Sequence, residues 1–249
     1  MTERDFFKAM EKKSRIRNRI VEVVFLVAAV IGVFVYLNFF GPGAAPHAMD
    51  ITDIPPYEKY SYVIINNDEP LFDASEMVPQ SYEFYSELDA LGRCGYAMAC
   101  VGRDLMPTEE RESISSIKPS GWVQAQYDIV EGNNLYNRCH LIGFQLTGEN
   151  ANERNLITGT QFLNTKCMLP YENLIADYVK ETGNHVLYRV TPIYEGDNLV
   201  ASGVQVEGWS VEDHGESISF HTYLYNVQPG VIIDYATGES RLDPDYSAQ

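Results

Sequence analysis

The strongest pattern along the chain is an unbroken apolar run near its N-terminus. Residues 21–40 (VEVVFLVAAVIGVFVYLNFF) are interrupted only by Glu22 and Asn38, and about 20 apolar residues suffice to cross a bilayer as a helix. The basic segment KKSRIRNR precedes the run, as is typical of a cytoplasmic flank. We therefore expect a single transmembrane helix over 20–40, with residues 1–19 as a cytoplasmic basic tail and the remainder outside the cell. A cleaved signal peptide and a secreted product remain the alternative.

Beyond the apolar run, the pattern predicts a tether and then one folded domain. Residues 41–60 are rich in Pro, Gly and Ala without sustained periodicity, which indicates a linker, and globular patterning begins near Tyr62. Helical spacing over 168–181 predicts one clear helix with Pro170 in its first turn. Strand-like patterns cover 122–130, 185–194, 199–209, 218–227 and 230–235, with a turn at 131–134. Residues 61–249 are thus expected to form an α+β domain with a mainly antiparallel sheet.

The charge distribution bears on the kind of partner. After residue 40 the chain carries 11 basic against 31 acidic residues, although the whole chain has a net charge of −17. Tight nucleic-acid binding usually relies on Lys and Arg that displace counterions from phosphates. Composition therefore argues against generic adhesion to a polyanion, unless a bound divalent cation reverses the charge locally.

The four cysteines are Cys94, Cys100, Cys139 and Cys167, and none of them forms a Cys-x-x-Cys pair. This spacing excludes a common structural zinc motif. Outside the cytoplasm Cys94 and Cys100 could close a short disulfide loop; the alternative is four buried thiols.

Chemically competent side chains are densest between residues 136 and 172. His140 is followed by Asn155, Asn164 and Glu172, just before the predicted helix. Histidine can accept a proton near neutral pH, and amide and carboxylate oxygens are hard ligands suited to Mg²⁺. Taken alone, a single histidine is more often a structural residue, and asparagine-rich segments are usually turns.

The order of these residues resembles the secreted DNA/RNA non-specific endonucleases of the ββα-metal, or His-Me, finger class. Their Asp-Arg-Gly-His signature corresponds to Asn137-Arg138-Cys139-His140, followed by Asn155-Leu-Ile-Thr, Asn164 and Glu172. The likeness extends over about residues 61–240.

The resemblance implies a ββα-metal finger core and a role for each matching residue. His140 would be the general base, and Asn164 the direct protein ligand of Mg²⁺, with Mn²⁺ as a possible substitute. Asn155 would position the histidine loop and substrate, Glu172 would hold metal-bound water, and Arg138 would face the phosphate. The implied products carry 5′-phosphate ends.

Two features of this sequence complicate the transfer of these roles from the family. Asn137 and Cys139 replace the family's Asp and Gly, and Cys139 is expected to be a small buried side chain. In an unbroken helix Asn164 and Glu172 would lie about 12 Å apart along the axis and about 80° apart around it. Glu172 should then act through water, unless the chain breaks near Pro170.

The sequence thus predicts a membrane-anchored, metal-dependent endonuclease that cuts DNA, and also RNA, without sequence specificity outside the cytoplasm. A membrane-tethered nucleic-acid-binding protein with reduced or no catalysis is the alternative, favoured by the acidic domain and the altered motif. A phosphodiesterase of narrower substrate range is a third reading. Five basic residues could form a phosphate-binding rim: Arg93, Arg103, Lys118, Arg154 and Lys166. The oligomeric state stays open.

Overall fold

The computed structural model describes residues 52, 54–58 and 60–247 of the chain. The predicted cytoplasmic tail and transmembrane segment, and most of the predicted linker, lie outside the described residues. Within the described ranges, none of the helices is long and apolar enough to cross a bilayer.

The domain is built on a six-stranded sheet in which every neighbouring pair is antiparallel. The strand order is β1 (Tyr62–Ile64), β8 (Ser219–Tyr225), β7 (Gly203–Ser210), β6 (Val186–Ile193), β3 (Ala97–Val101) and β2 (Tyr82–Tyr85). The α+β class and the antiparallel sheet predicted from the sequence are therefore confirmed, and β6 and β8 fall within predicted strand segments.

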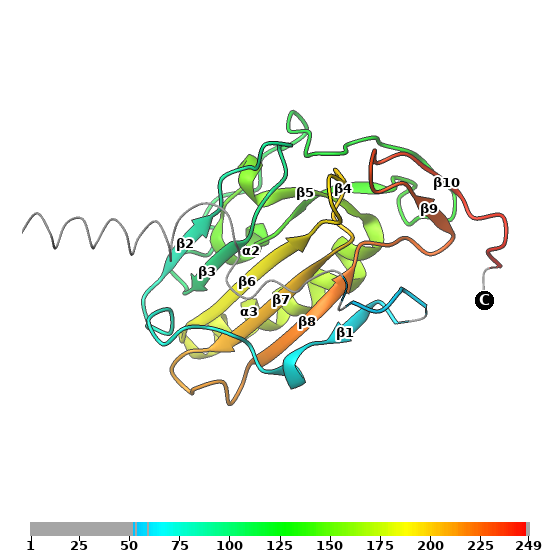
Figure 1. The fold of residues 1–249 in the computed structure, drawn as a ribbon. Coiled ribbons are helices and arrows are strands. Elements are labelled where there is room, and N and C mark those ends of the chain that lie inside the picture. Colours follow the sequence, from blue (N-terminus) through cyan, green and yellow to red (C-terminus); the bar gives the residue numbers. More distant parts are fainter. Residues whose placement is uncertain (1–51, 53, 59, 248–249) are drawn as a thin grey trace, which may run out of the picture. The chain divides into compact units, whose positions relative to one another are not determined.

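Both faces of the sheet are covered, and Figure 1 shows helix α3 (Leu169–Thr182) lying across one of them. Alternate residues of β6 separate the two sides: Tyr188 joins the main core with Ile175 and Val179 of α3. Leu187 belongs to a smaller core on the other face, which includes Phe72 of the irregular segment before β2. This segment follows the 3₁₀ turn η2 (Asn66–Asp68).

A second, two-stranded sheet precedes α3 in the sequence. Strand β4 (Tyr136–His140) pairs antiparallel with β5 (Leu156–Thr160). Their connection contains the short helix α2 (Phe144–Thr147) and the 3₁₀ turn η3 (Glu153–Asn155). After β5 the chain enters the π-helical turn η4 (Leu163–Met168) and continues directly into α3. A third small sheet, β9 (Val231–Ile233) with β10 (Ser240–Leu242), closes the described chain.

The strand predicted over 122–130 does not form. Only an isolated bridge links Gln126 to Asn134 in this stretch. The side chain of Gln124 accepts from the Tyr136 N–H at 3.0 Å and donates to the Tyr136 carbonyl at 2.7 Å, so a side chain takes the place of a partner strand. The turn that follows is as predicted, with positive φ at Gly132 and Asn133.

The possible disulfide between Cys94 and Cys100 is also absent, because all four cysteines are free and buried. Cys94 belongs to the main core, and its thiol donates to the Leu156 carbonyl at 3.2 Å. Cys100 faces the smaller core and donates to Val78. The two side chains thus lie on opposite faces of the sheet.

Candidate active site

A cavity of about 440 Å³ opens where the end of β4, the start of α2, the π-helical turn and the segment around residue 111 meet. Four of the five residues proposed from the sequence line it: Arg138, His140, Asn164 and Glu172. The fifth, Asn155, does not. Residues up to 34 positions apart in the sequence, from 138 to 172, thus converge on one concave surface.

His140 ends β4 with its side chain nearly enclosed, at 6% exposure. Its Nε2 lies 2.9 Å from the Asn150 carbonyl oxygen, an acceptor only, so Nε2 carries the ring proton and Nδ1 is left with a lone pair. Burial lowers the pKa of His140 to about 4; the Asn150 carbonyl opposes this shift and the Arg111 charge adds to it. The imidazole is therefore neutral at physiological pH.

Arg111 was not singled out in the sequence, yet its Nη2 lies 3.3 Å from His140 Nδ1 and it lines the cavity. Its neighbours Glu109, Glu110 and Glu112 make the segment look like an ordinary solvated surface. Nothing local marks this arginine, because only the tertiary fold brings it to the histidine.

Asn155 is completely buried and holds the chain immediately after His140. Its Oδ1 accepts from the Ile142 N–H at 2.8 Å, and its Nδ2 donates to the Ile142 carbonyl at 2.9 Å. The geometry suits the loop-positioning part of its expected role. A direct contact with substrate is not available from this interior position.

Asn164 and Glu172 face the same cavity, unlike the arrangement expected for an unbroken α-helix. The π-helical turn includes a bond from the Leu169 N–H to the Asn164 carbonyl, five residues apart instead of four. The π-helical turn takes up one extra residue, so the eight positions from Asn164 to Glu172 span about the same rotation as seven positions of a regular α-helix. Seven positions make two turns to within about 20°, which puts the two side chains on the same face. The chain does not break near Pro170, which lies in the first turn of α3 as predicted; the π-helical turn comes just before it.

Glu172 is 8% exposed, and burial raises its pKa to about 7 against the opposing effects of Gln145, Arg111 and the Gly143 backbone. The carboxylate lies against Gly143, where a Cβ atom would be 2.4 Å from Oε2. The buried Glu172 carboxylate and the Asn164 amide oxygen line the same cavity, and hard oxygen donors of this kind suit a divalent cation such as Mg²⁺. The donors present therefore suit the metal that the family resemblance implies.

Arg138 is fixed at the cavity wall by main-chain oxygens. Its Nε donates to the Ile117 carbonyl and its Nη2 to the Ser115 carbonyl at 2.6 Å, while the guanidinium lies 4.3 Å from the centre of the Trp122 ring. None of the five rim residues suggested by the sequence is among the residues that line this cavity. Three are in ion pairs: Arg93 with Asp89, Arg154 with Glu87, and Lys166 with Glu131.

The two departures from the family signature have defined contacts. The Asn137 amide donates to the side-chain oxygen of Gln161, the residue that follows β5. Cys139 is completely buried, as expected, and its thiol lies 3.2 Å from Asn164 Oδ1. Burial raises the pKa of this thiol far above its ordinary value, so it remains protonated.

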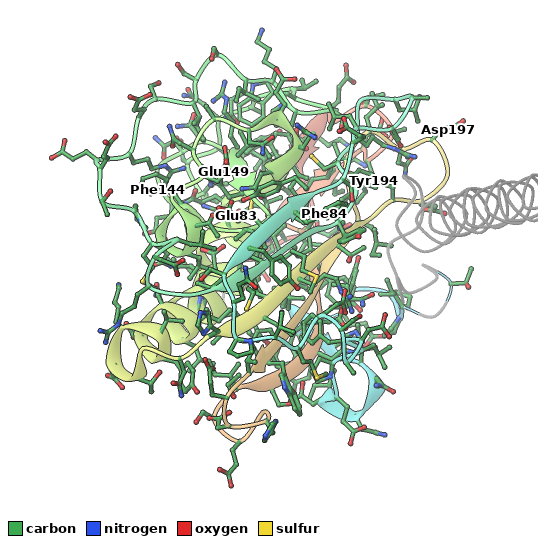
Figure 2. The ribbon with its side chains drawn as sticks, turned by 90° about the vertical axis from the view of Figure 1, so that its left-hand side faces the viewer. Glu83, Phe84, Phe144, Glu149, Tyr194 and Asp197 are labelled. Carbon is green, nitrogen blue, oxygen red and sulfur yellow. The ribbon has the colours of Figure 1, made fainter. Side chains whose placement is uncertain are left out.

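Acidic side chains gather at a second hollow next to Asn150. Glu87, Glu149 and Glu153 line this hollow, of about 510 Å³. Burial raises the pKa of Glu83, and the nearby Glu149 charge raises it further. Figure 2 shows Glu83 and Glu149 on the same side of the molecule as Phe144, which lines the first cavity. A polyanion approaching this flank would be repelled.

Comparison with known proteins identifies the family. A model of the DNA/RNA non-specific endonuclease family matches residues 73–211, more than half of the chain. The chain belongs to the DNA/RNA non-specific endonuclease family. It is a nuclease, and its matched region includes the cavity residues described above.

Solved structures of nucleases share the fold of this endonuclease. NucA from Streptococcus agalactiae with a magnesium ion bound is 26% identical, with a TM-score of 0.64 over 72% of this chain and 87% of NucA. A metal-free structure of the same NucA gives 25% identity and a TM-score of 0.66, over 78% and 92% of the two chains. The Sda1 nuclease with a bound zinc ion is similar in fold, with a TM-score of 0.60 at 24% identity over 74% of this chain and 97% of Sda1.

Proposed function

We propose that this endonuclease hydrolyses phosphodiester bonds of DNA and RNA without sequence specificity, using one Mg²⁺ ion and a ββα-metal finger formed by β4, β5 and the η4–α3 helix. The observation that carries the proposal is the single cavity in which His140, Asn164 and Glu172 meet beside two arginines. The magnesium ion bound in NucA, a structure of similar fold, supports the choice of metal, and Mn²⁺ is the expected substitute.

Asn164 would hold the ion through Oδ1, and Glu172 would provide the negative charge around it. When bound, Mg²⁺ supplies positive charge that stabilises the phosphorane-like transition state and the departing oxygen. The close approach of Gly143 fixes the Glu172 carboxylate in the cavity wall.

His140 would act as the general base through Nδ1. Because Nε2 donates to the Asn150 carbonyl, the proton acceptor of the neutral ring is the nitrogen that faces Arg111 and the cavity. Nδ1 would take a proton from water, the resulting hydroxide would attack phosphorus, and the 3′ oxygen would leave and be protonated by solvent. The products then carry 5′-phosphate and 3′-hydroxyl ends.

Arg111 and Arg138 would bind the non-bridging oxygens of the scissile phosphate. Arg138 already uses Nε and Nη2 on main-chain carbonyls, which orients its guanidinium but limits its free donors. Arg111 contacts the cavity histidine at 3.3 Å and would exchange this contact for a phosphate oxygen. Arg111 is therefore the stronger candidate for charge stabilisation.

We further propose that residues 20–40 anchor the nuclease in the cell membrane, residues 1–19 stay in the cytoplasm, and residues 61–249 act outside. The apolar run and its basic flank support this orientation. Secretion after signal cleavage is the competing arrangement, and the mass of the mature protein distinguishes the two.

Incubation of the purified full chain with plasmid DNA and with RNA, in Mg²⁺ or EDTA, tests the proposed activity. Wild type should cut both substrates only with the metal. His140→Ala should lose about 10²- to 10⁴-fold in rate, the usual contribution of a general base. His185→Ala is the matched control, because His185 pairs with Glu212 at 2.7 Å and does not line the cavity.

An intact plasmid in Mg²⁺ and Mn²⁺ would refute the proposed catalysis, as would equal cutting by His140→Ala. A gel shift of uncut DNA under those conditions would favour the tethered binding protein instead.

A further inference from the structure

Cys139 fills the contact between the β4–β5 hairpin and the π-helical turn. It is fully buried, and the space for it is made by Gly159 on the paired strand. A Cβ atom at Gly159 would lie 2.5 Å from Cys139 Cβ and 3.1 Å from its Sγ. The hairpin therefore accommodates a side chain at 139 only because there is none at 159.

The thiol has three acceptors within reach, and Asn164 Oδ1 is the nearest. Its Sγ lies 3.2 Å from Asn164 Oδ1, 3.5 Å from Met168 Sδ and 3.7 Å from the His140 carbonyl oxygen. A thiol has one proton to donate, and an amide oxygen is a better acceptor than a thioether sulfur. Because the amide oxygen has two lone pairs, it can accept from the thiol and still present the other lone pair to the cavity that Asn164 lines.

The orientation of the Asn164 amide decides whether it can bind a cation. A half-turn of the side-chain amide exchanges its oxygen for an NH₂ group, which has no lone pair for a cation and would repel it. A donor next to Oδ1 favours the orientation with the oxygen in place. A glycine at 139, as in the family signature, would lack this donor.

We propose that Cys139 is a positioning residue that holds the Asn164 amide with its oxygen ready for the divalent cation. The inference rests on the proposed function, in which Asn164 is the protein ligand of Mg²⁺. Cys139, which replaces the glycine of the family signature, would thus support metal binding through its hydrogen bond to Asn164. Its sulfur would not contact the ion.

Two substitutions separate the hydrogen bond from packing. Cys139→Ala removes the donor, whereas Cys139→Ser keeps a donor at the same position. Cys100→Ala is the matched control, because Cys100 is an equally buried thiol that donates to a main-chain oxygen in the other core. The melting temperature of each full-length variant without metal reports packing by itself.

The Mg²⁺ concentration that gives half of the maximal effect is then measured in two ways, by the rise in melting temperature and by cleavage rate. Cys139→Ala should raise both midpoints about three- to tenfold, the value of one ordinary hydrogen bond, with the rate at saturating Mg²⁺ within about twofold of wild type. Cys139→Ser and Cys100→Ala should keep the wild-type midpoints.

A lower melting temperature of Cys139→Ala with unchanged Mg²⁺ midpoints would mean that Cys139 only packs, and would overturn the inference. Equal midpoints for Cys139→Ala and Cys139→Ser, both raised, would overturn it too, since the donor would then be irrelevant. These results leave the proposed function intact. A wild-type protein with no response to Mg²⁺ in either measurement would overturn the proposed function and the role of Cys139 together.

Discussion

The candidate catalytic cavity contains an imidazole and a carboxyl group whose usual order of pKa values is reversed: the carboxyl group has the higher pKa. Burial lowers the pKa of His140 to about 4 and raises that of Glu172 to about 7. Lowering the pH should therefore protonate the carboxylate first, which affects metal binding, and the base only much later. Mg²⁺ affinity and turnover should thus depend on pH over different ranges.

The magnitudes follow from the two values. At pH 5.5 an imidazole of pKa 4 is about 97% neutral, whereas one at the ordinary value would be about 9% neutral. A carboxyl group of pKa 7 that must lose its proton to bind a cation weakens the affinity about 30-fold at pH 5.5. A carboxyl group with its ordinary pKa would leave the affinity almost unchanged at that pH.

The assay is cleavage of a short labelled duplex from pH 8.5 to 5.5, with a full Mg²⁺ titration at each pH. We expect the half-saturating Mg²⁺ concentration to rise about 30-fold, while kcat/KM at saturating Mg²⁺ stays within about twofold. Glu172→Gln should remove the pH dependence of the Mg²⁺ midpoint. A tenfold fall of kcat/KM at saturating Mg²⁺ by pH 5.5 would show that His140 titrates normally, and would refute the argument from its burial.

Three further substitutions test the surroundings of the site. Gly143→Ala places a Cβ 2.4 Å from the Glu172 carboxylate, so the Mg²⁺ midpoint of cleavage should rise about tenfold; an unchanged midpoint would contradict the close packing. Arg189→Ala removes the guanidinium that donates to the buried Glu207 carboxylate at 2.8 Å, and should cost about 3–5 kcal/mol in denaturant unfolding because the negative charge stays buried without a cation. A loss below 1 kcal/mol would mean that the ion pair is dispensable. Glu149→Gln removes a negative charge from the acidic second hollow and should raise kcat/KM roughly twofold at low salt, with no gain at about 1 M salt. A gain that persists in high salt would not be electrostatic.

The fold was predictable where the pattern of apolar residues is long and regular. Strand β6 lies within the strand predicted over 185–194, and its successive residues Val186, Leu187 and Tyr188 alternate between the main and the smaller core. The stretch 122–130 carries a weaker form of the same pattern but forms no strand. The Gln124 side chain makes the hydrogen bonds to the Tyr136 N–H and carbonyl that a neighbouring strand would make. Local alternation does not report such a side-chain substitute for a strand.

Four of the residues that line the candidate site were named from the sequence, but their geometry was not. The order of His140, Asn164 and Glu172 is a property of the sequence, whereas the π-helical turn that puts two of them on one face is not visible in the residue pattern. Arg111 and the Asn150 carbonyl were missed for a related reason. Both act on His140 from loops, through contacts that only the tertiary fold creates.

The acidic composition and the nuclease activity are reconciled by where the positive charge lies. Among the described basic residues, Arg93, Arg154 and Lys166 are paired with carboxylates, and Arg189 is buried. Four others do not line the cavity: Arg103, Lys118, Lys180 and Arg241. Arg111 and Arg138 line the catalytic cavity. If these two arginines are the residues that contact phosphate, as proposed, log K should fall with log salt with a slope of only about −2 for duplex DNA. Positive charge spread along the backbone would tighten ground-state binding without raising turnover, whereas charge confined to the reacting phosphate can act on the transition state. An enzyme that cuts at any sequence has no register to hold, so this concentrated charge can serve catalysis on an otherwise acidic surface.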